Sequence, residues 1–190
     1  MNGEWCVFNK NFSKEYCERI IELSNNIPKQ VATIGVNGVT ISSEYRRSQI
    51  AFIQRDMLEF QLLFDDLWKL CCTANNDWFN FHISKFDYIQ YAEYSSTEHA
   101  EYKRHHDVFY MNNDLKYHRK LSAVVQLSDP DSYTGGELEI YNIDSECPAD
   151  MFKNQGSVIL FPSFTTHAVL PVTRGVRNSL AIWVDGPKWR

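Results

Sequence analysis

The chain has 190 residues, of which 44% are hydrophobic and 23% charged, and its formal net charge is −5 at pH 7. This length is enough for one well-packed domain and too short for two ordinary ones, so we expect a single domain over residues 1–190. The acidic balance and the lack of a basic run argue against direct nucleic-acid binding.

No segment of the sequence indicates a membrane or a secretory route. The start, Met1 to Trp5, has neither the basic nor the apolar region of a signal peptide. No run reaches the roughly 18 apolar residues that a membrane span needs. Five cysteines without a C-x-x-C spacing favour neither a disulfide framework nor a zinc site. We therefore expect a cytoplasmic monomer with reduced, mostly buried thiols.

The N-terminal part of the chain contains two predicted helices. Ser13 is placed to cap the first helix, and Phe12 can pack back on Cys17 as a hydrophobic staple. The second helix is predicted to begin at Asp56, where Glu59 completes a capping-box pattern. Its apolar residues have helical spacing: Phe60, Leu63, Phe64, Leu67 and Cys71. Such apolar stripes are typical of residues in a hydrophobic core. Both helices should therefore pack against the outside of a sheet and take no part in catalysis.

Between these helices, residues 31–53 alternate in the manner of strands. The Asn37-Gly38 pair is a hairpin signal within this segment. The polar residues 44–48 that follow are typical of an exposed loop. We expect residues 1–78 to form a region of helices and a hairpin that supports the remainder.

From Phe79 to the end of the chain, short apolar runs are separated by turn residues. Examples of these turn residues are Gly135-Gly136 and Arg174-Gly175. The pattern predicts an all-β module over residues 79–190. A β-sandwich without any functional site would explain this alternation of apolar runs and turn residues equally well.

Three side chains in this module have the order of a metal site. In an extended segment residues i and i+2 share a face, so His105 and Asp107 can converge on one ion while His106 faces away. His167 supplies a third ligand. Two imidazoles and one carboxylate form the facial triad of Fe(II) oxygenases. An H-x-D pair alone is more often an accident of the sequence than a ligand pair.

Arg177 and Ser179 follow His167 by ten and twelve residues, in a run whose β-branched and aromatic content predicts a strand. Turn residues over 171–175 are expected to let the two strands lie antiparallel, which would bring the ligand and the arginine into one cavity. A guanidinium beside the metal can bind the far carboxylate of a 2-oxo acid.

From about Phe86 to Lys188, the chain resembles the Fe(II)- and 2-oxoglutarate-dependent dioxygenases, within them the prolyl 4-hydroxylase branch. The segments that carry this resemblance are residues 91, 102–107, 121–128, 135–141, 156–163, 167–173 and 175–183. It implies a mostly β fold with flanking N-terminal helices, namely a double-stranded β-helix, or jelly roll, with the metal at its open end.

The resemblance also implies a role for each site residue. The metal ligands are His105, Asp107 and His167. Arg177 and Ser179 bind the far carboxylate of 2-oxoglutarate. The residues expected to line the co-substrate pocket or lie near the metal are Leu138, Val169, Trp183 and Tyr91. Gln126 aligns with a tyrosine that helps to bind that carboxylate in animal oxygen-sensing prolyl hydroxylases, so this contact is weaker here, replaced by the amide or transferred to Ser179.

The implied reaction consumes 2-oxoglutarate and O2 and releases succinate and CO2, and ascorbate can serve as reductant. The branch suggests a proline in a peptide or protein as substrate, with residues 31–48 at the place of a closing loop. The aromatic residues expected near the mouth are Tyr45, Phe52, Tyr94 and Tyr110. Hydroxylation of another amino acid side chain or of a small metabolite stays open. So do a non-catalytic jelly-roll binding module and, more distantly, a zinc hydrolase.

Overall fold

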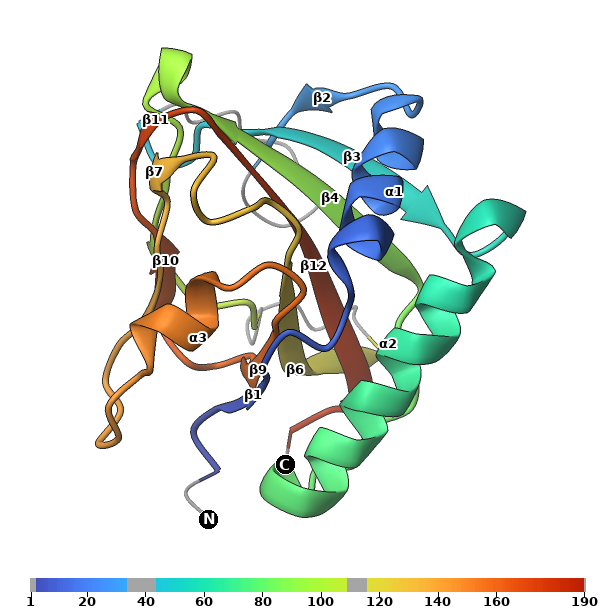
Figure 1. Ribbon diagram of the computed structural model, residues 1–190. Coiled ribbons are helices and arrows are strands. Elements are labelled where there is room, and N and C mark those ends of the chain that lie inside the picture. Colours follow the sequence, from blue (N-terminus) through green and yellow to red (C-terminus); the bar gives the residue numbers. More distant parts are fainter. Residues whose placement is uncertain (1–2, 34–43, 109–115, 190) are drawn as a thin grey trace.

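A long antiparallel sheet forms one wall of the molecule. The computed structural model describes residues 3–33, 44–108 and 116–189. In spatial order the strands are β1 (Cys6–Phe8), β9 (Val158–Pro162), β6 (Tyr117–Gln126), β12 (Val176–Pro187), β4 (Tyr88–Ser95), β3 (Gln49–Gln54) and β2 (Gln30–Val31). All neighbouring pairs run antiparallel. Figure 1 shows the long strands β12, β4 and β6 crossing the molecule side by side.

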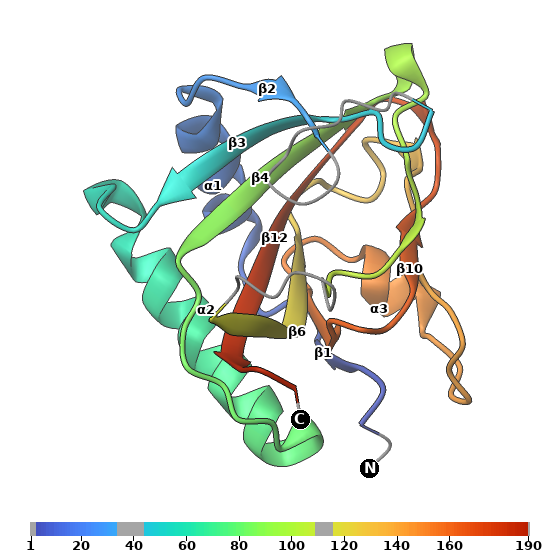
Figure 2. The ribbon, with the colours of Figure 1, turned by 180° about the vertical axis from the view of Figure 1, so that it is seen from behind.

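A second, smaller layer faces this sheet. It comprises β5 (Tyr102–His105), β10 (His167–Val169) and β8 (Leu138–Ile140), with β10 in the centre. A separate two-stranded ladder joins β11 (Val172–Arg174) to β7 (Thr134–Gly135). In Figures 1 and 2, β10 lies on the opposite side of the fold from the β3 and β4 edge. These two antiparallel layers confirm the predicted jelly roll.

Two helices cover the outer face of the long sheet. Helix α1 (Lys14–Asn25) and helix α2 (Gln61–Ala74) bury their apolar stripes in one core cluster with the strands. Ser13 caps α1 by accepting the Tyr16 N–H at 3.2 Å. Phe12 is buried in that cluster and its ring contacts Tyr16. The whole predicted stripe of the second helix is buried: Phe60, Leu63, Phe64, Leu67 and Cys71.

The predicted start of the second helix was wrong. A 3-10 turn, η2 (Leu58–Phe60), precedes α2, and neither η2 nor α2 has a side-chain cap. The α-helix therefore begins at Gln61 rather than at Asp56. Three shorter elements complete the described chain: η3 (Asn75–Phe79), η4 (Ser96–Glu98) and α3 (Ala149–Lys153).

The division at residue 78 stays a prediction, although strands from both parts form one sheet. Strand β1 pairs with β9, and β3 pairs with β4. Strands β2 and β3 pair antiparallel, as the base of the expected hairpin requires. Its Asn37-Gly38 tip lies outside the described residues.

All five cysteines are free thiols, and three of them are buried. Among the residues that the structure describes, no helix is long and apolar enough to cross a membrane.

Candidate active site

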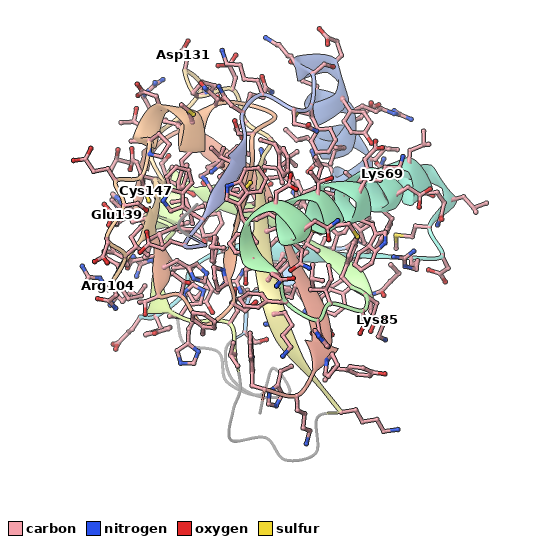
Figure 3. All side chains as sticks on the ribbon, turned by 90° about the horizontal axis from the view of Figure 1, so that it is seen from below. Lys69, Lys85, Arg104, Asp131, Glu139 and Cys147 are labelled. Carbon is pink, nitrogen blue, oxygen red and sulfur yellow. The ribbon has the colours of Figure 1, made fainter. Side chains whose placement is uncertain are left out.

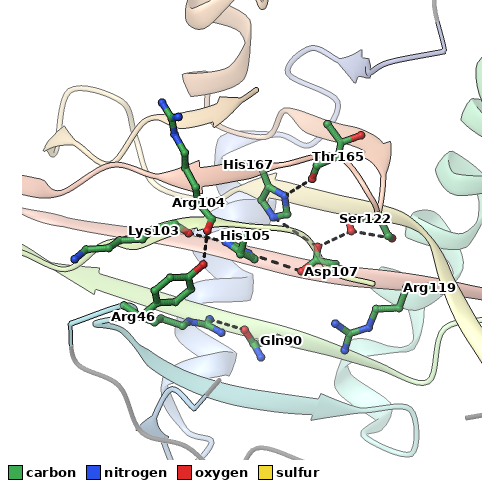
Figure 4. A network of polar contacts seen from close by, with 12 residues as sticks. Arg46, Gln90, Lys103, Arg104, His105, Asp107, Arg119, Ser122, Thr165 and His167 are labelled. Atoms are coloured by element: carbon green, nitrogen blue, oxygen red, sulfur yellow. Dashed lines mark hydrogen bonds and ion pairs between the residues drawn. The ribbon is translucent and has the colours of Figure 1, made fainter. Parts of the chain in front are cut away.

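The jelly roll brings the three expected metal ligands together. His105 ends β5 and His167 begins β10, and these two residues are direct partners in the antiparallel ladder. The His105 Nε2 lies 3.8 Å from Asp107 Oδ1, and the His167 Nε2 lies 3.6 Å from Asp107 Oδ2 (Figure 4). One potential ligand atom from each residue lies within 4.8 Å of the others, so a single ion can contact all three.

Backbone carbonyls orient both imidazoles toward this point. The His105 Nδ1 lies 2.8 Å from the Lys103 carbonyl oxygen, and the His167 Nδ1 lies 3.0 Å from that of Thr165. A carbonyl only accepts, so each Nδ1 carries the proton and donates it. Each Nε2 is therefore left with its lone pair toward Asp107. This is the ring arrangement that metal-binding histidines adopt in proteins.

The carboxylate is held in place by a short hydrogen-bond chain. Asp107 lies two residues beyond His105, just after β5, and its N–H donates to the Ser163 carbonyl at 2.8 Å. The Ser122 hydroxyl donates to Asp107 Oδ2 at 2.6 Å and contacts the Ser163 hydroxyl at 3.0 Å. The rotation of the carboxylate is therefore constrained before any ion binds.

The ionisation states suit metal binding. Burial, followed by the nearby His167, lowers the pKa of His105 to about 3. Burial alone would raise the pKa of Asp107, but His167, His105, Arg119 and the Ser122 hydroxyl together lower it below its ordinary value. At neutral pH the site thus offers a neutral imidazole and a carboxylate, which are the forms that bind a divalent cation.

Arg177 is buried in the same cavity without an anion among the described residues. Its side chain is 1% exposed, and its Nη1 donates to the Ser179 hydroxyl at 3.1 Å. Its Nε and Nη2 are buried and have no hydrogen-bond partner in the described part of the chain. A buried guanidinium with two unused donors fits a carboxylate ligand. The chain therefore fits both groups that the resemblance implies, Fe(II) and 2-oxoglutarate.

One narrow cavity joins the triad to the arginine. Its lining includes eight of the ten expected site residues: His105, Asp107, His167, Leu138, Val169, Arg177, Ser179 and Trp183. We call it the metal cavity. It lies between the two layers of the jelly roll. Strand β10 belongs to the smaller layer and β12 to the long sheet, so His167 and Arg177 reach the cavity from opposite layers. The predicted hairpin between these strands was wrong; residues 172–174 pair with β7 instead.

The two remaining expected residues lie elsewhere. Tyr91 is fully buried in the core beneath the helices, and its hydroxyl donates to Asn178 at 2.8 Å. On β4 the residues that line the metal cavity are Gln90, Ala92 and Tyr94. Tyr94 is therefore the β4 tyrosine of the site. Gln126 borders a neighbouring cavity rather than the metal cavity.

Sequence reasoning also missed Arg46, which it assigned to an exposed loop. Arg46 is 6% exposed and lines the metal cavity. Its Nε donates to the Ser48 hydroxyl at 3.0 Å and its Nη2 to the Gln90 side-chain oxygen at 2.7 Å. Its guanidinium lies 4.4 Å from the centre of the Tyr102 ring. No sequence pattern indicated this burial, because the contacts come from separate segments of the chain.

A strip of aromatic side chains leads to the metal cavity across the inner face of the long sheet. The rings of Phe52 and Tyr88 lie 5.3 Å apart, and those of Tyr88 and Trp183 lie 6.0 Å apart. The Arg119 guanidinium covers Trp183 at 4.1 Å. The expected mouth residue Tyr110 lies outside the described residues. Tyr45 does lie near the site, donating a hydrogen bond to the Arg104 carbonyl.

Residues 89–185 match the family model of the 2OG-Fe(II) oxygenase superfamily. The match covers about half of the chain, and the chain belongs to this superfamily. The predicted class, with Fe(II), 2-oxoglutarate and O2 as its cofactors, is thereby confirmed.

The curated relatives that the chain matches include PKHD-type hydroxylases. One from Teredinibacter turnerae is 43% identical over 79 residues, covering 41% of this chain and 34% of that protein. The PKHD-type hydroxylase YbiX of Escherichia coli O157:H7 is 43% identical over 65 residues, covering 34% of this chain and 28% of that protein. The chain thus matches about a third of the length of these relatives.

Solved structures share the fold over almost the whole chain. A Pseudomonas putida prolyl-4-hydroxylase has a TM-score of 0.73 at 20% identity, covering 99% of this chain and 95% of that chain. A Trichoplax adhaerens prolyl hydroxylase, solved with a hypoxia inducible factor peptide, has a TM-score of 0.74 at 19% identity, covering 96% and 83%. At these identities the likeness establishes the fold.

Proposed function

We propose that this chain is an Fe(II)- and 2-oxoglutarate-dependent dioxygenase that hydroxylates a prolyl residue in a peptide or protein. The observation that carries the proposal is the joint presence, in one cavity, of an oriented His105–Asp107–His167 triad and a buried Arg177 with two unused donors. The overall reaction converts a substrate C–H bond, 2-oxoglutarate and O2 into C–OH, succinate and CO2.

Each side chain has a defined task in this reaction. His105, Asp107 and His167 would hold Fe(II), which supplies the activation of O2 when bound. Arg177, steadied by Ser179, would bind the far carboxylate of 2-oxoglutarate. The apolar walls Leu138 and Val169 would keep water away from the reacting groups.

A non-catalytic binding module is the main alternative from another class, and the buried arginine speaks against it. A module that binds only a metal has no use for a guanidinium with two unused donors nearby. Succinate release on addition of 2-oxoglutarate separates the two functions. A zinc hydrolase would likewise leave Arg177 without a task.

The peptide substrate is supported by the aromatic strip. Phe52, Tyr88 and Trp183 present ring faces and edges along the sheet, and Arg119 adds a cation beside the metal cavity. Grooves with aromatic walls suit prolyl segments, which are already extended and lose little entropy on binding. The Trichoplax neighbour was solved in complex with a peptide, which agrees with this proposal.

Incubation with Fe(II), 2-oxoglutarate and a library of prolyl peptides tests the substrate. A gain of one oxygen on proline, accompanied by equimolar succinate, is the expected result. Oxygen addition to another side chain or to a small metabolite would keep the dioxygenase and overturn the prolyl substrate. Use of ascorbate, a monomeric state and a cytoplasmic location stay predictions.

A further inference from the structure

The turn that joins β9 to β10 holds two of the three proposed metal ligands. Its Ser163 carbonyl accepts the Asp107 N–H at 2.8 Å, and its Thr165 carbonyl lies 3.0 Å from the His167 Nδ1. Phe164 lies between these two residues in the chain, and it is 46% exposed. Any contact that fixes Phe164 therefore also fixes both carbonyls, because each belongs to a residue directly beside it.

The indole of Trp189 packs against this β9–β10 turn from the segment that follows β12. Its ring centre lies 5.7 Å from that of Phe164 and 5.2 Å from that of Phe81. The Phe81 and Phe164 rings lie 6.4 Å apart, so the three rings form one cluster. Edge-to-face packing of this kind is a favoured arrangement of aromatic rings. Phe164 thus has aromatic partners outside the turn to which it belongs.

Strand β6 also holds the indole. The Trp189 backbone N–H donates to the His118 Nδ1 at 3.1 Å, and the Lys120 Nζ lies 3.5 Å from the centre of the indole ring. The Lys120 carbonyl accepts the Ser163 N–H at 3.0 Å, so Lys120 contacts both the indole and the turn. Figure 2 shows the chain after β12 beside the lower end of β6, and Figure 3 shows this end of the fold from below.

The indole N–H takes no part in these contacts. The Trp189 Nε1 is buried and has no hydrogen-bond partner in the described part of the chain. Ring packing, the Lys120 ammonium and the backbone hydrogen bond therefore place this side chain. A phenylalanine, which has a ring but no N–H, should be able to replace it.

We infer that Trp189 is a positioning residue for the metal site. By packing on Phe164 it keeps the β9–β10 turn in the arrangement that orients Asp107 and His167. Contacts that orient a ligand from outside raise metal affinity without touching the metal. Trp189 is not among the residues that line the metal cavity, so it acts through the turn. The effect on the metal rests on the proposed function, whereas the effect on the turn does not.

The effect on the turn is measured by amide hydrogen exchange of the metal-free full chain. Trp189→Ala should raise the exchange rate of the Asp107 amide about tenfold, because its acceptor carbonyl is no longer fixed and the turn opens locally. The amides of Ala123 and Leu160, which pair in the main core, should exchange as in the wild type. Trp189→Phe should keep the Asp107 amide protected. Unchanged exchange at Asp107 in Trp189→Ala, or an equal increase at the two core amides, overturns the assignment.

The effect on the metal is measured by calorimetry with Mn(II). Trp189→Ala should bind Mn(II) about tenfold more weakly, the lower end of the loss for a supporting contact, and Trp189→Phe should stay within about twofold of the wild type. Trp68→Ala is the matched control, because Trp68 is also partly buried but packs on Phe86 in the main core. It should lower the melting temperature without weakening Mn(II) binding. Equal Mn(II) affinities for the two alanine variants overturn the positioning role.

Phe164→Ala gives a second test, since an exposed turn residue can be truncated without emptying the core. It should reproduce the faster Asp107 exchange and the weaker Mn(II) binding. Combined with Trp189→Ala, it should add no more than about a twofold further loss, because both changes break the same contact. Fully additive losses, or unchanged Asp107 exchange in Phe164→Ala, overturn the route through Phe164 even if Trp189→Ala fails to fold. If the wild type binds no Mn(II), the proposed function fails, and hydrogen exchange still decides whether Trp189 holds the turn.

Discussion

Arg177 is the most informative single side chain of this protein. Burying a guanidinium without a counter-charge is unfavourable, because no ion pair offsets the desolvation. Ser179 satisfies only one of its donors. The fold therefore tolerates a destabilising residue at a place where a carboxylate would supply the missing partner, which is the usual sign of a binding function.

Replacing Arg177 should weaken co-substrate binding far more than it harms the fold. Arg177→Ala should lose about 2–5 kcal/mol of 2-oxoglutarate binding, as for truncation of one partner of a buried charge pair. Arg177→Lys should lose part of this binding free energy, because an ammonium cannot make the bidentate contact. The charge-transfer band of the anaerobic Fe(II) protein, titrated with 2-oxoglutarate, measures the affinity. Arg174→Ala is the control, because Arg174 is an exposed residue of β11. Equal affinities for both alanine variants would refute the assignment.

Removal of a metal ligand should abolish turnover. His167→Ala deletes one of three ligands and should lower succinate production by orders of magnitude, with Mn(II) affinity falling in parallel. His106→Ala is the matched control, since His106 is exposed and lies outside the ligand cluster. Near wild-type succinate production by His167→Ala would show that the metal site is wrongly placed.

Ser122 should matter through Asp107 alone. Ser122→Ala deletes the 2.6 Å hydrogen bond that fixes the carboxylate. Loss of such a supporting contact typically costs about 10–100-fold in metal affinity. Calorimetry with Mn(II) measures the loss, and 2-oxoglutarate affinity at saturating metal should change little. A large change in the latter with no change in metal affinity would contradict this role.

Within each strand or helix, some side chains enter the core and others face away from it, and this division determines which residues can reach the site. On β4, Ile89 and Tyr91 enter the core beneath α1 and α2, whereas the alternate residues Gln90, Ala92 and Tyr94 line the metal cavity. Helix α2 makes a comparable division between adjacent cysteines. Cys71 is 1% exposed in the core, whereas Cys72 is partly exposed.

Native alkylation should distinguish these two thiols. Burial, followed by the neighbouring Cys72, raises the pKa of Cys71 to about 12, so its reactive thiolate is scarce at pH 8. Cys72 should react with iodoacetamide at least about 100-fold faster. Fragment mass spectrometry assigns the label to each residue, and both should react alike in guanidinium chloride. Equal native rates would mean that α2 presents a different face to the sheet.

We expect the fold to be stable without the metal. Its largest core lies between the helices and the long sheet and contains none of the three ligands. Chelation with EDTA should therefore leave a cooperatively folded protein. Mn(II) and 2-oxoglutarate should each raise the unfolding free energy, by about 2.7 kcal/mol at a hundredfold excess over Kd. Thermal denaturation measures this, with Asp107→Ala as the unresponsive control. Unfolding by EDTA would contradict this independence.

The sequence predicted several features of this protein correctly, because helix caps, apolar stripes and the alternation of side chains along a strand depend on residues that are close together in the chain. Ser13 caps α1, the α2 stripe is buried, and His105, Asp107 and His167 meet, as their spacing predicted. The resemblance placed Tyr91 near the metal. Which face of β4 turns inward depends on the layers packed against it, and Tyr91 lies in the core beneath the helices, whereas Gln90, Ala92 and Tyr94 line the metal cavity.

What the sequence alone established is the set of chemical groups: a facial triad, a distant arginine and the strand pattern that carries them. Which layer holds each group was decided by tertiary structure, because β10 pairs with β5 and β8 while β12 pairs with β4 and β6. Burial of Arg46 and the unused donors of Arg177 also arise only when strands distant in sequence close around them. Hydrogen bonding between strands and desolvation depend on such neighbours, and spacing along one chain does not specify them.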